Sequence, residues 1–104
     1  MAIVSARVPT PNARTYMLQL SKHWGHRLDV TQFEDSARIE FGHAVCELTA
    51  RPDALMVEVS AAPKDLERMQ AVVVDHINRF AFREGPLPFE WTRTDGAAET
   101  PTSA

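Results

Sequence analysis

The chain has 104 residues, enough for one domain with its own core and too few for two. Its formal net charge of −3, from 11 basic and 14 acidic side chains, argues against nucleic acid as the main partner. The single cysteine excludes an internal disulfide, and no run of 18 apolar residues is present to cross a membrane. Because the first residues also lack the layout of a signal peptide, we expect a cytoplasmic protein.

The first 25 residues predict a strand followed by a helix. From Ala2 to Val8, apolar residues alternate with other residues, as in a strand with one buried face. Thr10 is the expected N-cap of the helix, Pro11 suits its first turn, and Gly25 is expected to end it. The apolar stripe of this helix consists of Ala13, Tyr16, Met17, Leu20 and Trp24.

Four short segments in the middle of the chain show the alternation of half-buried strands. They cover residues 28–33, 37–41, 44–49 and 55–60, with turns over 34–36 and 51–53. This spacing is typical of an antiparallel meander with one face in water. The acidic residues of that face, interleaved with Arg38, are expected to form a solvated surface: Asp29, Glu40, Glu47 and Glu58.

The longest helical pattern in the chain covers residues 63–84. Pro63 suits its first turn, and Gly85 followed by Pro86 is expected to stop it. Its apolar stripe consists of Leu66, Met69, Val73, Ile77 and Phe80. Asp75, opposite this stripe, is expected to pair with Arg79.

These elements, with a short last strand over residues 89–93, follow in the order β-α-β-β-β-β-α-β. This order predicts an α+β fold, a two-layer sandwich in which two helices cover one face of a mainly antiparallel sheet. We expect a single domain over residues 1–94. Residues 95–104 contain no large apolar side chain and are predicted to be a disordered tail.

Four histidines and one cysteine raise the question of a metal site. His43 and Cys46 are three apart in a strand-like segment, so their side chains should point to opposite faces. Cys46 lies on the apolar face, which favours a core role over a ligand role. His23 and His26 have a spacing that suits a shared metal on a helix, but Gly25 between them is expected to end the helix. A metal site therefore stays an open hypothesis.

His23 and His76 each lie at the edge of the apolar stripe of their helix. If these edges face each other, the imidazoles and an arginine would form a cationic notch suited to a carboxylate, hydroxamate or phosphate group. The alternative is that both histidines only pack or cap and that the arginines pair with neighbours. The candidate ligand-binding residues are His23, Trp24, His26, Cys46, His76, Arg79 and Arg83.

Several short motifs make the chain similar to a known family. They are SARV at 5–8, TPNA at 10–13, KHWGH at 22–26, Gly42 with Cys46, DHINRFAFRE at 75–84, and Trp91. Over roughly residues 3 to 92 the chain resembles DUF2218, a small bacterial domain family of unknown function. Because the family has no established catalytic residues, the resemblance assigns none here, and the cofactor stays unknown. It does imply an association of some members with siderophore-interacting flavin reductases.

Three functional hypotheses follow. The first is a binding or accessory module for an iron-siderophore or related anionic ligand, with a siderophore-interacting reductase as a partner. The alternative is a protein-interaction or homodimerisation module without a ligand, in which Val45 and Met56 form the apolar seed on the outer sheet face. A small enzyme with a histidine general base comes third, because no nucleophile or carboxylate partner can be assigned to any histidine.

Overall fold

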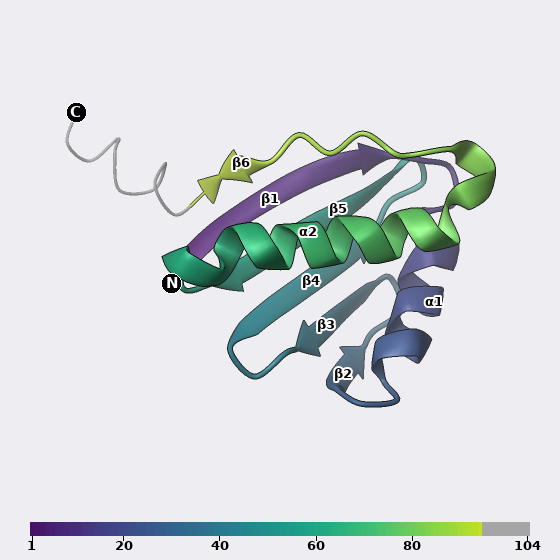
Figure 1. Ribbon diagram of the computed structural model, residues 1–104. Helices are drawn as coiled ribbons and strands as arrows, with labels where there is room; N and C mark the ends of the chain where they lie inside the picture. Colours follow the sequence, from purple (N-terminus) through teal and green to yellow (C-terminus); the bar gives the residue numbers. More distant parts are fainter. Residues whose placement is uncertain (95–104) are drawn as a thin grey trace.

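The computed structural model describes residues 1–94, which form one six-stranded sheet with two helices packed on one face (Figure 1). The elements are β1 (Ala2–Pro9), α1 (Ala13–Trp24), β2 (Asp29–Gln32), β3 (Ser36–Glu40), β4 (Ala44–Ala50), β5 (Ala54–Ala61), α2 (Pro63–Phe80), a 3₁₀ helix η1 (Phe82–Glu84) and β6 (Thr92–Arg93). The predicted α+β sandwich and its element order are confirmed. The predicted tail lies outside the described residues.

All strand pairs in the sheet are antiparallel, and the strand order is β2-β3-β4-β5-β1-β6. Strands β2 to β5 form the predicted meander. β1 pairs with the free edge of β5, in a register that places Ala2 opposite Ala61 and Pro9 opposite Ala54. α1 lies over β2, β3 and β4, and α2 lies over β5 and β1, so that α1 meets the C-terminal half of α2 (Figure 1).

The core lies between this sheet and the two helical stripes. Alternate residues of the strands point inward, and the helix residues facing them are almost completely buried. The largest buried side chains are Met17, Leu20, Ile39, Leu48, Leu55 and Ile77. Each such side chain contributes roughly 1.5–3 kcal/mol of burial free energy, so packing of the two stripes fixes where the helices lie. No helix among residues 1–94 is both long and apolar enough to cross a membrane.

The predicted end of α1 at Gly25 and start of α2 at Pro63 are confirmed, whereas the other two predicted helix boundaries need correction. α1 begins at Ala13 with Asn12 as its N-cap, because Thr10 is still tied to the sheet through its N–H, which donates to the Asp53 carbonyl (3.0 Å). The Thr10 hydroxyl accepts the Asn12 N–H instead (3.1 Å). α2 ends at Phe80, four residues before the predicted end, because the backbone leaves the helical conformation at Ala81 and continues into η1.

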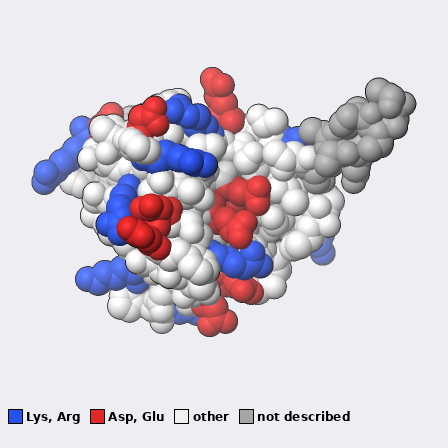
Figure 2. All heavy atoms as spheres, turned by 180° about the vertical axis from the view of Figure 1, so that it is seen from behind, with Lys and Arg blue, Asp and Glu red and all other residues white. Residues whose placement is uncertain are grey.

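No described element covers the other face of the sheet, where acidic and basic side chains lie interleaved (Figure 2). Arg38 pairs with Glu47 (3.0 Å) and with Glu40 (3.5 Å), as expected for a solvated surface. Glu58 lies opposite Glu47, and partial burial together with the neighbouring Glu47 carboxylate raises the pKa of Glu58. This acidic pair occupies the middle of the open face.

The two apolar residues of the open face do not form one patch. Val45 lies opposite Ser60 and Met56 lies opposite Thr49, with the Glu47–Glu58 pair between them. The predicted apolar seed for a partner is therefore split by two carboxylates. A homodimer through this face stays a prediction and gains no support from the arrangement.

Candidate functional site

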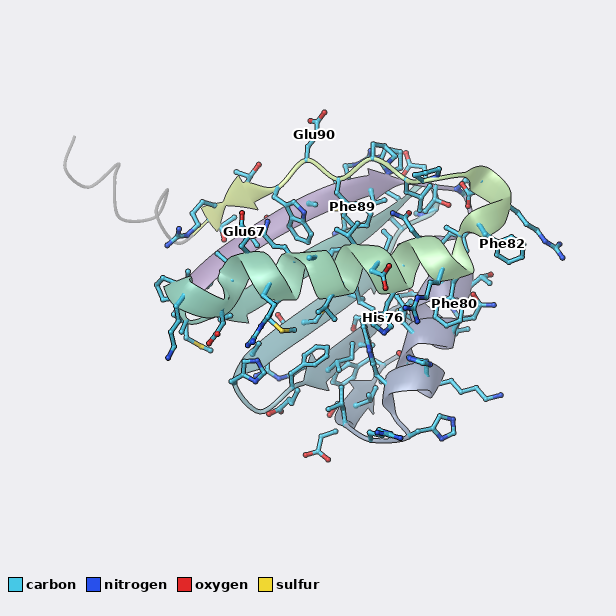
Figure 3. The ribbon with its side chains drawn as sticks, in the orientation of Figure 1. Glu67, His76, Phe80, Phe82, Phe89 and Glu90 are labelled. Atoms are coloured by element: carbon cyan, nitrogen blue, oxygen red, sulfur yellow. The ribbon has the colours of Figure 1, made fainter. Side chains whose placement is uncertain are left out.

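The edges of the two helical stripes meet at two histidines. His23 lies near the end of α1 beside the buried Trp24, and His76 lies on α2 next to the core residue Ile77. The ring centres of His23 and His76 are 5.3 Å apart, and their planes are tilted by 48°. Figure 3 shows His76 and Phe80 on the side of α2 that faces α1. The side-by-side helices expected from the sequence thus bring the two imidazoles together.

The hydrogen bonding of His76 sets its tautomer. Its Nδ1 lies 2.8 Å from the carbonyl oxygen of Val72, and because a carbonyl can only accept, Nδ1 carries the proton. In the neutral ring the lone pair is then on Nε2. Within residues 1–94, neither this nitrogen nor the ring of the exposed His23 has a hydrogen-bond partner. Nitrogen atoms of both rings are therefore without an internal hydrogen-bond partner among these residues.

Trp24 forms the wall behind the two imidazoles. Its ring centre is 5.2 Å from that of His76, and Phe41 packs edge-on against its other side at 5.3 Å. Beside it lies a pocket of about 540 Å³, lined by His23, Trp24, His26, Arg27 and Leu28. None of these residues is acidic, so the pocket combines an aromatic wall with a cationic rim.

A second polar contact joins η1 to the start of α1. The Glu84 carboxylate accepts hydrogen bonds from the Thr10 hydroxyl (2.8 Å), the Asn12 amide (3.0 Å) and the Tyr16 hydroxyl. These donors, Asn12 first, lower the pKa of Glu84. Burial and the bond to Glu84 raise the pKa of Tyr16. The contact holds η1 against α1 and explains why the chain turns away after Phe80.

Known proteins share the sequence pattern and the fold of this chain. A family model described as an uncharacterized protein conserved in bacteria (DUF2218) matches residues 5–92. The chain belongs to the DUF2218 family. The NMR structure of PA4090 from Pseudomonas aeruginosa is similar to this DUF2218 chain, with 35% sequence identity and a TM-score of 0.76. The match covers 88% of this chain and 96% of that chain. No curated protein matches the sequence.

The resemblance seen in the sequence is thereby confirmed, and it leaves the function open. The family has no assigned activity, so function has to be argued from the site of this DUF2218 chain itself. Of the seven candidate residues, three lie in direct ring contact, His23, Trp24 and His76. His26 lines the adjoining pocket.

The remaining three candidates lie elsewhere in the DUF2218 fold. Arg79 pairs with Asp75 on the exposed side of α2 (3.1 Å), as the sequence predicts. Arg83 lies on η1, with its guanidinium 5.6 Å from the centre of the Phe82 ring. Cys46, for which both a core and a ligand role were open, is completely buried in the core, and burial raises its pKa to about 12. Its thiol therefore does not line the pocket.

Sequence reasoning missed two features of this site. Arg27 supplies the arginine of the pocket, in place of Arg79 or Arg83, and its only signal was its position directly after His26. The role of Glu84 was also missed, since its donors are 68 to 74 residues away in the chain. His43 lies apart from the pocket, with its Nε2 at 3.5 Å from the Arg68 guanidinium.

Proposed function

We propose that this DUF2218 domain is a binding module for a small anionic ligand, with an iron-siderophore complex as the ligand class. The observation that carries the proposal is the apposition of His23 and His76 at 5.3 Å beside the Trp24 ring and the Arg27 pocket. A pocket of about 540 Å³ is within the range of small-molecule sites. The association of some family members with siderophore-interacting reductases, which the sequence resemblance implies, is the reason for choosing this ligand class and for proposing such a reductase as the partner.

The chemistry of the lining residues favours an anion with flat groups. The Arg27 guanidinium is permanently charged and can hold a carboxylate, hydroxamate or catecholate oxygen through paired N–H donors. The Trp24 ring offers an apolar surface on which a planar chelating group can stack. The imidazoles of His23 and His26, which line the pocket, add N–H donors at the rim. No nucleophile or carboxylate contacts either imidazole among the described residues, so binding accounts for the site better than catalysis does.

The test is quenching of Trp24 fluorescence by ferric siderophore complexes. The Trp91→Phe variant leaves Trp24 as the one tryptophan, because the chain has two and Trp91 stacks on Phe89 away from the pocket. We expect saturable quenching by a ferric tris-catecholate or a ferric tris-hydroxamate, together with a rise in melting temperature. Absence of saturable quenching with both complexes would contradict the proposal.

Two arginine variants test whether the siderophore complex binds in the pocket that Arg27 lines. Arg27→Ala removes the cationic group of the pocket and should weaken binding of the anionic catecholate complex about tenfold, the loss of one charge-assisted contact. Arg83→Ala removes an exposed arginine of η1 outside this pocket and should leave binding unchanged. Equal losses in both variants would indicate a general charge effect and would contradict a site at Arg27.

A further inference from the structure

We infer that His23 and His76 bind a transition-metal ion directly, as two of its ligands, and that the ion arrives in an anionic complex with two adjacent coordination positions open. The inference rests on the proposed function, since His23 lines the proposed pocket and His76 contacts the rings of His23 and Trp24 beside it. It changes the chemistry of binding: the protein completes the coordination sphere of the metal instead of contacting only the outside of a closed complex.

The spacing of the two rings suits a shared ion. Imidazole nitrogens bind such ions at about 2.0–2.1 Å, so two imidazoles on one ion have ring centres roughly 5 Å apart. The observed separation of His23 and His76 is 5.3 Å. His23 is exposed and has no hydrogen bond within residues 1–94, so its ring can turn to the ion without losing a partner.

His76 is already held in the state that a metal ligand needs. Its Nδ1–H donates to the Val72 carbonyl at 2.8 Å, which places the lone pair on Nε2. Metal-binding histidines generally donate their other ring N–H to a carbonyl or carboxylate, which fixes the tautomer and the ring orientation. Contact with the Trp24 ring at 5.2 Å restricts the imidazole further. The bond to Val72 thus provides the outer-shell support of a ligand.

Within residues 1–94 the site has two protein ligands and no third. No group of three or more His, Cys, Asp or Glu side chains among residues 1–94 lies close enough together to hold a metal ion. An ion at His23 and His76 must therefore keep other ligands, and Arg27 at the rim favours an anionic set. Imidazole suits Zn²⁺, Cu²⁺, Ni²⁺ and iron. The ligand class is a partly chelated ion of this kind.

Two nickel complexes test the inference on the purified, untagged chain. Nickel nitrilotriacetate is anionic and leaves two adjacent positions open, whereas nickel ethylenediaminetetraacetate is anionic and closed. By isothermal titration calorimetry, we expect the open complex to bind at least about tenfold more tightly than the closed one, because only the open one can accept imidazole nitrogens. Equal affinities for the two complexes would overturn the inference.

Histidine variants then identify the ligands. His23→Ala and His76→Ala should each weaken binding of nickel nitrilotriacetate about tenfold or more, while His43→Ala, at a histidine apart from the pocket, should match the parent chain. Circular dichroism checks that each variant is folded. If His76→Ala unfolds, His23→Ala still tests the inference, because His23 is exposed and its removal should leave the fold intact. Unchanged affinity in folded His23→Ala would overturn the inference.

The two proposals can fail separately. Quenching by closed ferric complexes without selective nickel nitrilotriacetate binding would overturn direct coordination and leave the siderophore pocket standing. Selective nickel binding without any ferric-siderophore quenching would support the two-histidine site and contradict the siderophore ligand.

Discussion

α1 takes part in two polar contacts, one with η1 and one with α2, and the two differ in how their polar atoms are satisfied. Near the start of α1, the Glu84 carboxylate accepts hydrogen bonds from Thr10, Asn12 and Tyr16. Near the end of α1, His23 and His76 face each other, and the bond from His76 Nδ1 to Val72 is the one hydrogen bond of the pair within residues 1–94. The polar atoms of the first contact are hydrogen-bonded to one another. In the second contact, Nε2 of His76 and the ring nitrogens of His23 have no hydrogen-bond partner within residues 1–94.

This difference separates a structural contact from a binding contact. Polar groups that are satisfied inside the chain stabilise the fold, and removing one partner leaves the others unpaired. Polar groups without an internal partner at a half-exposed edge contribute little to folding and remain available to a ligand. Substitutions at the Glu84 contact should therefore change stability and spare binding, whereas substitutions at the histidines should do the reverse.

The largest effect on stability is expected for Glu84→Ala. The change removes one charged acceptor from three donors and should lower the free energy of unfolding by about 1–2 kcal/mol, reduced by the exposure of the carboxylate. Urea denaturation measures this difference. Glu90→Ala, which removes another exposed carboxylate, is the control and should change stability by less than about 0.5 kcal/mol. Similar losses in both variants would show that the Glu84 contact has no special structural role.

Tyr16→Phe should have the next largest effect, about 1 kcal/mol, because it removes one donor and keeps the buried ring. The folded-state pKa of Tyr16 is raised, so its stabilisation is present below the unfolded pKa of about 10 and is lost as the pH rises through the folded value. The variant should therefore be less stable than the parent chain at pH 7 and should lose less stability in alkali. Parallel stability curves for the two chains at high pH would count against this contact.

A smaller effect is expected in acid. The folded-state pKa of Glu84 is lowered, so its stabilisation is complete above the unfolded pKa of about 4.3 and is lost as the pH falls through the folded value. Below about pH 4.3, the parent chain should lose stability more steeply than Glu84→Gln, whose amide does not titrate. Urea denaturation at a series of pH values compares the slopes, and identical slopes would contradict the assignment.

The smallest effect on stability is expected for His23→Ala. His23 is exposed and has no hydrogen bond within residues 1–94, so the free energy of unfolding should change by less than about 0.5 kcal/mol. Nickel nitrilotriacetate binding by the same variant should fall about tenfold or more. A loss of more than 1 kcal/mol on urea denaturation would place His23 among the structural residues and remove the contrast between the two contacts.

Local patterns in this chain predicted the fold well and the site only in part. Alternation placed Val57 and Val59 inward, and helical spacing placed Ile77 against the sheet, because both follow from backbone geometry within a few residues. The same spacing put His23 and His76 at the edges of their stripes. The N-cap at Thr10 was wrong, because a backbone bond to the distant Asp53 holds that residue in the sheet.

By itself, the sequence determined the α+β class, the order of elements, the inward faces of the strands and helices, and the histidines as residues to examine. Only the tertiary structure decided which arginine joins the pocket, which nitrogen of His76 carries its lone pair, and why α2 ends at Phe80. The physical reason is the distance along the chain over which each kind of interaction acts. Periodicity and turn chemistry act over neighbouring residues, whereas the Glu84 contact and the histidine pair depend on how two helices pack across one sheet.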